Sequence, residues 1–229
     1  MKKGKLIVID GLDGAGKATQ TKLLVERLKK DGKKVMTLDF PRYQDNFFGK
    51  LIGECLSGQH GDFLHLDPHI ASVLYAADRF EAAGKIRKWL DEGRYVILDR
   101  YVSANQIHQG GKIKDVRARK EFLHWLDTLE YKVFAIPKPD KVIFLDVTPE
   151  VTREMLLQAN QQQKKSYLSK KTKDVVEESV EYMKASRVAA LFLAKNEKNW
   201  ERISCVARGS ILAREVIAER VYQAVRNIK

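Results

Sequence analysis

One stretch decides the fold, Gly11-Leu12-Asp13-Gly14-Ala15-Gly16-Lys17-Ala18-Thr19, which directly follows the apolar run 5–10. A helical pattern begins at Lys17, so the order is strand, glycine-rich loop and helix, which is the context of a phosphate-binding loop. Glycines let the backbone curl until successive N–H groups point at one anion, and the helix start adds partial positive charge. The stretch therefore predicts a binding site for a nucleoside triphosphate such as ATP or GTP, with Lys17 reaching the outer phosphates.

One position departs from the usual pattern of such loops. The residue after the lysine is normally Ser or Thr, whose hydroxyl binds Mg²⁺, and here it is Ala18. Thr19 follows one place later, but an offset of one residue turns a helical side chain by about 100°. We therefore do not expect Thr19 to replace the missing hydroxyl directly. The alternative, a plain glycine-rich turn, is disfavoured because both the strand and the helix are present.

Composition restricts the classes of protein to consider. The chain has 229 residues with 44% hydrophobic content, enough for one sizeable α/β domain. Its two cysteines, Cys55 and Cys205, are far apart in sequence, which argues against a disulfide scaffold and favours a reducing cytosol. Because no apolar run has membrane length and the basic start lacks a long apolar segment, we expect a cytoplasmic protein without a membrane span or signal peptide.

The net charge of +12 is compatible with nucleic acid or with a ligand that carries several anionic groups. The positive charges are spread along the chain apart from one concentrated run at 164–173, and aromatic residues do not interleave with them as in single-strand binders. A solvated basic surface with a phosphate site is therefore favoured over a nucleic-acid partner. A nucleic-acid-binding module with a phosphate loop remains an alternative, and it would bind with a steep dependence on salt.

Apolar runs separated by helical patterns predict a parallel sheet covered by helices on both faces. We expect strands at 5–10, 35–38, 95–98, 141–146 and 200–205. We expect helices at 17–30, 47–57, 68–91, 115–130, from Pro149, and at 174–195 and 213–227. The segment 103–114, which contains Gly110 and Gly111, is predicted to be a loop. Ligands of such sheets bind beyond the carboxyl ends of the strands, so the residues that follow the strands are the candidates for a site.

Charged side chains follow two of these strands. Arg42 and Arg100 are positioned to grip phosphate oxygens with paired hydrogen bonds, and phosphoryl transfer depends mainly on such positioning and charge neutralisation. Asp99 is a candidate ligand for Mg²⁺. Each of these residues also has a purely structural alternative role. The arginines could form ion pairs within the protein, and Asp99 could form one with Arg100. Asp13, inside the glycine-rich loop, could cap a turn or reach a substrate hydroxyl.

Four segments in order resemble the thymidylate kinase family. They are the loop 11–17 with Thr19-Gln20, Phe40-Pro41-Arg42-Tyr43, Leu74-Tyr75-Ala76-Ala77-Asp78-Arg79, and Asp99-Arg100-Tyr101. The resemblance extends over nearly the whole chain. It implies a single P-loop kinase domain over 1–229, with a three-layer α/β fold, a central parallel sheet, a mobile lid at about 158–173, and assembly as a homodimer. The implied reaction is transfer of the γ-phosphoryl group of ATP to dTMP, with Mg²⁺, which gives dTDP.

The resemblance also implies roles for individual residues. Those expected at ATP are Gly11, Asp13, Gly14, Ala15, Gly16, Lys17, Ala18 and Thr19. Those expected at the nucleotide acceptor are Phe40, Arg42, Tyr43, Tyr75, Arg79, Arg100, Asn105, His108 and Gln109. Within these sets, Lys17, Arg100 and Asp13 would be catalytic, and Asp99 would hold the metal. Tyr75 would stack on thymine, and Arg79, one helical turn later, would hydrogen-bond a thymine carbonyl.

The chain departs from the family pattern in ways that affect the predicted chemistry. His108 occupies the place of a tyrosine near the sugar, and Ala15 occupies a loop position that carries an arginine in some members. The lid would then supply the neutralising cation, yet no arginine lies between Arg153 and Arg187. The candidates there are lysines, namely Lys164, Lys165, Lys170 and Lys171. Two further alternatives stay open: another P-loop kinase of nucleosides or nucleotides, and a catalytically weakened homologue that binds nucleotides.

Overall fold

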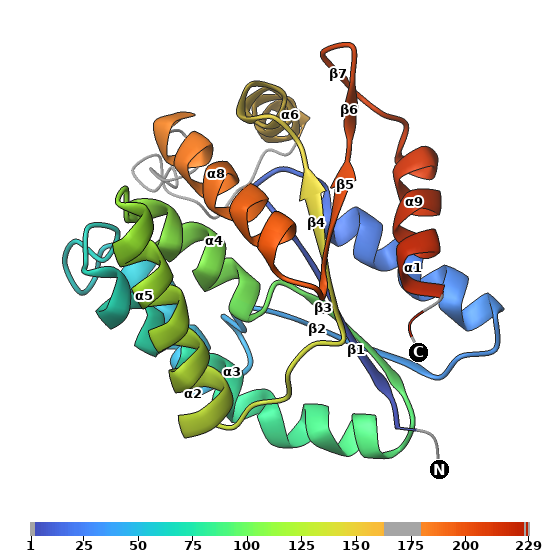
Figure 1. Ribbon diagram of the computed structural model, residues 1–229, viewed down its shortest axis with the longest axis horizontal. Coiled ribbons are helices and arrows are strands. Elements are labelled where there is room, and N and C mark those ends of the chain that lie inside the picture. Colours follow the sequence, from blue (N-terminus) through green and yellow to red (C-terminus); the bar gives the residue numbers. More distant parts are fainter. Residues whose placement is uncertain (1–2, 163–179, 227, 229) are drawn as a thin grey trace.

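A five-stranded parallel sheet forms the centre of the computed structural model, which describes residues 3–162, 180–226 and 228 (Figure 1). The strand order is β2-β3-β1-β4-β5. The strands are β1 (Lys5–Gly11), β2 (Val35–Asp39), β3 (Tyr95–Asp99), β4 (Lys141–Asp146) and β5 (Trp200–Ser204). The predicted parallel sheet is confirmed. Its central strand, β1, leads directly into the glycine-rich loop, so this loop lies at the middle of the sheet's carboxyl edge.

Helices cover both faces of the sheet, as the apolar strands require (Figure 1). One face is covered by α1 (Lys17–Lys30) and α9 (Arg214–Arg226). The other is covered by α3 (Pro68–Asp91), α4 (Val102–Lys112), α5 (Val116–Thr128) and α8 (Val180–Asn196). The remaining elements are α2 (Phe47–Leu56), the π-helical segment η1 (Leu129–Val133), α6 (Pro149–Gln162), and a hairpin of β6 (Val206–Ala207) and β7 (Ser210–Ile211).

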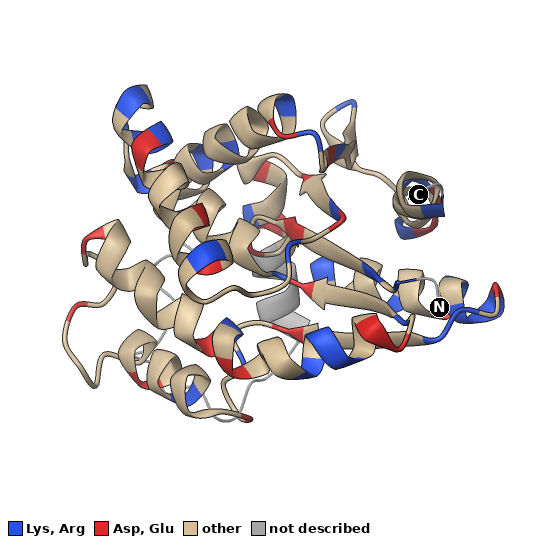
Figure 2. Ribbon diagram, turned by 60° about the horizontal axis from the view of Figure 1, so that its bottom comes forward, with Lys and Arg blue, Asp and Glu red and all other residues tan. Residues whose placement is uncertain are grey.

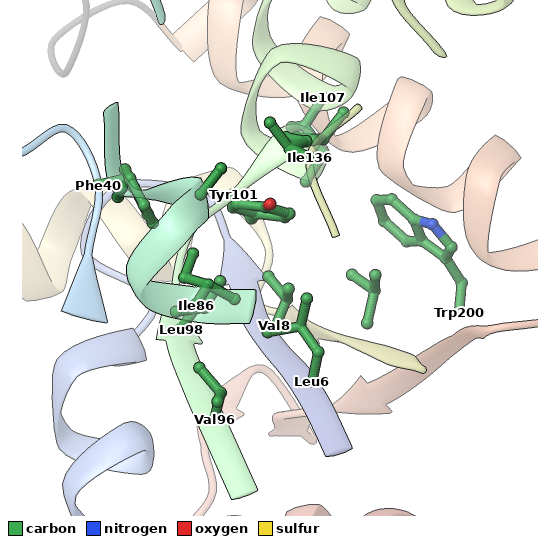
Figure 3. Close-up of a cluster of buried hydrophobic side chains, with 14 of the residues drawn as sticks. Leu6, Val8, Phe40, Ile86, Val96, Leu98, Tyr101, Ile107, Ile136 and Trp200 are labelled. Atoms are coloured by element: carbon green, nitrogen blue, oxygen red, sulfur yellow. The ribbon is translucent and has the colours of Figure 1, made fainter. Parts of the chain in front are cut away.

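The larger core lies between the sheet and the α3 side (Figure 3). Leu6 and Val8 of β1 point into it beside Leu98 of β3, and they meet Ile86 of α3 and Tyr101 from the end of β3. The intervening strand residues point to the opposite core, so β1 is buried on both faces. Full burial of one such aliphatic side chain is worth about 1.5–3 kcal/mol, and these contacts hold the strand ends in fixed relative positions.

The segment 103–114 is a correction to the sequence prediction, because most of it is the helix α4 and not a loop. Gly110 and Gly111 suggested a turn, but the reason for at least one glycine is packing. A Cβ at Gly111 would lie 3.0 Å from the Cα and N atoms of Ser186 in α8. The glycine therefore lets two helices approach closely, a requirement set by a residue far away in sequence.

A second difference is the hairpin that follows β5, which was not predicted. Its turn places Arg208 and Gly209 at φ values of 51° and 79°. Arginine is not a residue that usually marks such a left-handed turn, so the local sequence gave a weak signal. The other predicted helices and strands are present with small shifts at their ends. The described part of the helix predicted at 174–195 is α8, which begins at Val180.

The predicted lid falls largely outside the described residues. Its first residues, 158–162, belong to α6. Lys164, Lys165, Lys170 and Lys171 lie outside the described part of the chain. Within the described part, no helix is both long and apolar enough to cross a membrane. Figure 2 shows basic and acidic residues interspersed along the helices in this view, which agrees with the spread of charge in the sequence.

Candidate functional site

The glycine-rich loop connects β1 to α1 with the geometry that its glycines allow. Gly14 and Gly16 have φ values of 83° and 84°, in the left-handed region that favours glycine, and Gly16 is the residue before α1. The Lys17 ammonium donates to the carbonyl oxygens of Gly11 and Leu12, at 3.2 Å and 2.9 Å. The lysine is thus folded back over the loop, at the positive end of the α1 dipole.

A cavity of about 390 Å³ opens in front of this loop. Its walls come from the loop and from the ends of β2 and β3, and they include Asp13, Gly14, Gly16, Lys17, Ala18, Thr19, Asp39, Asp99 and Arg100. Most of the residues predicted at ATP therefore share one cavity. Backbone amides, a helix start and an ammonium group around one space form a site for an anion such as a polyphosphate.

Besides Asp13, two carboxylates line the same cavity, and one of them, Asp99, is the metal ligand that the sequence predicts. Asp39 and Asp99 are register partners on the neighbouring strands β2 and β3. The pKa of Asp99 is raised to about 6: burial is the main cause, the charge of Lys17 opposes it, and the carboxylates of Asp10 and Asp39 add to it. Asp39 was missed because nothing local distinguishes it from other acidic residues at strand ends.

Mg²⁺ takes oxygen ligands and is usually held by one or two carboxylates together with substrate phosphates and waters. The pair Asp39 and Asp99 has that donor chemistry. Among the described residues, no group of three or more His, Cys, Asp or Glu side chains gathers as a metal cluster. The residues present therefore fit a magnesium ion that shares its coordination with a nucleotide, as opposed to an all-protein metal cage.

A second and larger cavity, of about 980 Å³, lies next to the first. Its walls hold most of the residues predicted at the acceptor, namely Phe40, Tyr43, Tyr75, Arg79, Arg100, Asn105, His108 and Gln109. The two cavities share the walls formed by Asp13, Phe40, Pro41, Tyr43 and Arg100. Arg100 and Asp13 therefore lie where the two spaces meet, between a polyphosphate site and an aromatic pocket of nucleoside size.

Arg100 has an unusual backbone at this junction. Its φ value is 65°, which is left-handed and uncommon for a residue other than glycine. Its N–H donates to the carbonyl oxygen of Ile9 at 3.0 Å, which fixes the strand end. Its guanidinium forms an ion pair with Asp13, whose carboxylate is also 3.8 Å from the Lys17 ammonium. Such backbone strain costs roughly 1–3 kcal/mol and occurs preferentially at functional sites.

Arg79 lies in the cavity wall but is already engaged within the protein. Its side chain is 2% exposed, and its Nε donates to both carboxylate oxygens of Glu130, at 3.0 Å and 3.2 Å. Its Nη1 donates to the carbonyl oxygen of Tyr101 at 3.3 Å. The sequence does not indicate Glu130 as the partner of Arg79, because Glu130 comes from η1, distant from α3 along the chain. Arg79 thus has a structural partner in addition to its place beside the cavity.

Arg42 is not brought into either cavity. Its Nη2 donates to Asp45 at 2.9 Å, and its backbone N–H donates to Asp78 at 3.2 Å. Asp78 also accepts a bond from Asn46, at 2.8 Å, so it organises the turn after β2. In this structure Arg42 forms the local ion pair that the sequence analysis had kept as its alternative role.

The far wall of the larger cavity contains residues that the sequence analysis did not assign. Residues 63–68, from the loop before α3 and the first position of that helix, line it. The ammonium of Lys112 in α4 donates to the carbonyl oxygen of Leu64 at 2.7 Å and so holds this loop in place. The ring of Phe63 packs at a tilt against Tyr75, with centroids 5.8 Å apart. Tyr182, from the start of α8, completes the wall near His108.

Comparison with known proteins identifies what this arrangement is similar to. Residues 9–204 match the family model described as thymidylate kinase. The thymidylate kinase of Mycobacterium tuberculosis is 35% identical over 149 residues, which are 65% of this chain and 69% of that protein. The probable thymidylate kinase of Thermococcus gammatolerans is 36% identical over 149 residues, 63% of this chain and 66% of that protein.

A solved structure, that of the thymidylate kinase from Candida albicans, has a similar fold, with a TM-score of 0.70. The match covers 98% of this chain and 92% of that chain at 21% sequence identity, so it bears on the fold alone.

Proposed function

Because this chain belongs to the thymidylate kinase family, and is thus a nucleoside monophosphate kinase, we propose that it transfers the γ-phosphoryl group of ATP to dTMP. One observation carries the proposal: a phosphate-type cavity and a nucleoside-sized cavity meet at Asp13 and Arg100. In-line transfer between two nucleotides needs two adjoining sites with cationic groups at their junction. The products would be dTDP and ADP.

The donor side uses the glycine-rich loop. Its amides, together with the start of α1, bind the β- and γ-phosphates of ATP, and Lys17 leaves the carbonyl oxygens of Gly11 and Leu12 to neutralise the outer phosphates. Thr19 and Ala18 line the same cavity. Asp99, with Asp39 beside it, would hold Mg²⁺, which would supply positive charge to neutralise the donor phosphates.

The acceptor side uses the larger cavity. Arg100 holds the phosphate of dTMP with the paired N–H groups of its guanidinium, which Asp13 releases or shares when that phosphate enters. Tyr75 offers a ring face to the base, and Asn105, whose amide donates to the Ser72 carbonyl at 3.2 Å, presents its amide oxygen near the base edge. Phe40, Tyr43 and Gln109 surround the sugar and base, and His108 lies in the same wall beside Arg100.

Arg79 would reach thymine only with N–H groups that Glu130 and Tyr101 leave unused. The described contacts therefore support a double role, in which Glu130 fixes the guanidinium and the remaining N–H groups face the cavity. Arg42 would need to leave Asp45 before it could reach an acceptor phosphate, so we place it outside the resting site.

The transferring group also needs a cation on the side away from Arg100. Ala15 cannot supply one, so we propose that a lid lysine does, from the set Lys164, Lys165, Lys170 and Lys171. A lysine gives a point charge and lacks the fork of an arginine. These four lysines lie outside the described residues, so this assignment rests on the sequence.

We also propose that the chain forms a homodimer in the cytosol. Large apolar side chains are exposed on neighbouring helices, with Phe47 of α2 68% exposed and Ile70 and Phe80 of α3 59% and 51% exposed. A surface of this kind is usually covered by a partner. The two cysteines, Cys55 and Cys205, are buried as free thiols, which fits a reducing compartment. Sedimentation velocity would test the dimer, and a monomer at micromolar concentration would contradict it.

The decisive experiment for the reaction is a coupled assay of ADP release with ATP and Mg²⁺, in which dTMP, dUMP, thymidine, UMP and dCMP are offered separately. Turnover concentrated on dTMP is the expected result. Turnover concentrated on another acceptor would keep the kinase and overturn the assignment of the base-reading residues. Binding of ATP without turnover on any acceptor would point to the weakened homologue that Ala18 and the lysine lid suggest.

A further inference from the structure

His108 occupies a central place in the wall of the larger cavity. It lies in α4, is buried, and contacts Arg100 after β3 and Tyr182 in α8. Its Nε2 atom is 3.5 Å from Nη1 of Arg100, and its ring is parallel to that of Tyr182, with centroids 5.8 Å apart and planes at 8°. His108 therefore connects the residue at the junction of the two cavities with the helix that follows the lid.

The contact with Arg100 determines the protonation state of the imidazole. A guanidinium has only N–H donors, so Nε2 must present its lone pair, and the single proton of the neutral ring must be on Nδ1. Burial lowers the pKa of His108 well below its ordinary value, and the positive charges of Arg100, Lys17 and Lys112 lower it further. Tyr182 is the facing group from α8. The ring is therefore neutral when the enzyme is at physiological pH.

Nδ1 of His108 is buried and has no hydrogen-bond partner among the described residues. A buried N–H without a partner costs roughly 1–3 kcal/mol, so the ring is not held in this position for the sake of stability alone. What the protein gains is an acceptor at Nε2. The distance of 3.5 Å is long for a hydrogen bond, and contacts of this kind commonly tighten when substrate binds.

The helix behind the ring is also fixed in place. Arg187 of α8 pairs with the buried carboxylate of Asp146 at the end of β4, with Nε and Oδ1 2.6 Å apart. Gly111, close to His108 in α4, allows the backbone of Ser186 to pack directly against α4. Tyr182 is therefore held in a fixed position, and the plane of the imidazole cannot tilt without losing its stacking on Tyr182.

From these contacts we propose that His108 is a positioning residue for phosphate recognition: its neutral Nε2 accepts from Arg100 and aims the guanidinium at the acceptor phosphate. This inference rests on the proposed function, in which Arg100 binds the phosphate of dTMP. In this role His108 acts on the substrate through Arg100, and it does not contact the sugar directly. The role requires an acceptor atom at Nε2, and it does not require an aromatic ring as such.

The role predicts an effect that depends on the substrate's phosphate. Replacement of the acceptor, as in His108→Phe, lowers the affinity for dTMP by about tenfold, because Arg100 loses the partner that aims it. The same replacement leaves the affinity for thymidine, which lacks the phosphate, nearly unchanged. A direct contact with the sugar would instead weaken both ligands equally.

The experiment compares two matched variants by calorimetric titration with dTMP and with thymidine. His108→Phe keeps a ring against Tyr182 but removes the acceptor, whereas His108→Gln keeps an acceptor oxygen but removes the ring. We expect the ratio of the two affinities to fall about tenfold in His108→Phe and to recover largely in His108→Gln. His124→Phe, in the exposed face of α5, serves as the control for loss of a histidine elsewhere. Thermal unfolding checks that each variant is folded.

Three results would overturn the proposal. Equal loss for dTMP and thymidine would assign His108 to the sugar, and loss in His108→Gln with none in His108→Phe would assign it to stacking. The third result is an additive loss of dTMP affinity when His108→Phe is combined with Arg100→Ala, which would show that His108 does not act through Arg100. If the unmodified protein binds neither dTMP nor thymidine, then the proposed function fails and not this inference alone.

A measurement on the unmodified protein avoids the question of folding. In a sample with ¹⁵N-labelled histidine, the NMR signals of His108 should report a neutral ring with its proton on Nδ1. A proton on Nε2, or a cationic ring at pH 7, would overturn the proposal, because neither form can accept from Arg100.

Discussion

Asp39 and Asp99 are directly opposite one another at the ends of two neighbouring parallel strands, and both face the cavity that Lys17 lines. If they hold Mg²⁺ with the donor phosphates, Asp99→Asn should raise the Mg²⁺ concentration needed for half-maximal rate by at least about tenfold. Asp39→Asn should cause a smaller increase. The measurement is a Mg²⁺ titration at saturating ATP, and an unchanged midpoint in both variants would remove the pair from the metal site.

Asp99 also makes the stability of the empty protein depend on pH. Burial and the neighbouring acids raise its pKa to about 6, so between its ordinary value and about 6 the native state holds a proton that the unfolded chain releases. The free energy of unfolding therefore falls as pH rises through this window. Asp99→Asn should remove this decrease in the free energy of unfolding. The variant should therefore be more stable than the unmodified protein at pH 7.5, and the difference in stability should be smaller at pH 4. Urea unfolding in EDTA measures this, and equal stability at pH 7.5 would contradict it.

Because Ala18 has no hydroxyl, we expect the enzyme to need a higher Mg²⁺ concentration for half-maximal rate than a variant with a hydroxyl at this position. Ala18→Ser should lower the Mg²⁺ concentration at half-maximal rate by roughly fivefold, which corresponds to about 1 kcal/mol. Ala18→Gly serves as the control, since it changes the backbone freedom but supplies no hydroxyl. No difference between the serine and glycine variants at limiting Mg²⁺ would show that the loop position has no part in metal binding.

The buried pair of Arg79 and Glu130 should dominate the effect of substituting Arg79. Arg79→Ala leaves the carboxylate buried without its partner, so the free energy of unfolding should fall by roughly 3–5 kcal/mol. If Arg79 also reads thymine, the preference for dTMP over dCMP should fall in Arg79→Ala, whereas Glu130→Gln, which retains the guanidinium, should keep that preference. The readouts are urea unfolding and kcat/KM for the two nucleotides. Loss of stability with no change in preference would make Arg79 purely structural.

The close approach of α4 and α8 predicts unequal effects at two adjacent glycines. A methyl group at Gly111 would collide with the backbone of Ser186, so Gly111→Ala should lower the free energy of unfolding by roughly 1–3 kcal/mol. At Gly110 the nearest atom to a new Cβ is 3.7 Å away, in ordinary contact, so Gly110→Ala should be neutral or stabilising in this helix. Denaturant midpoints for the two variants test the pair, and equal effects would contradict the predicted geometry.

The sequence predicted those features whose cause is local. The loop 11–19 can be identified because strand, glycines and lysine occur together in sequence. The start of α3 could be predicted because Pro68 is tolerated in a first helical turn, and the structure adds a cap from Asp67. The parallel sheet followed from apolar strands that lack polar alternation, such as β1. These predictions needed no knowledge of distant residues.

The features that were missed have distant causes. Gly111 looks like a turn residue until Ser186 is placed against it, and Arg79 looks like an exposed or base-reading arginine until Glu130 is placed beside it. Asp39 becomes a candidate metal ligand only through its register with Asp99. In each case the partner comes from another element of the fold, and no periodicity in the local sequence reports which partner it will be.

The left-handed backbone of Arg100 has a consequence for anyone who engineers this protein. Glycine adopts that conformation freely, so a screen that selects variants by heat resistance alone should reward the replacement of Arg100 by glycine. The selected variant would have higher thermal stability and would lack the guanidinium between the two cavities. Libraries intended to produce a stable and active enzyme should therefore keep Arg100 unchanged, because selection for heat resistance favours glycine at this position and selection for turnover favours arginine.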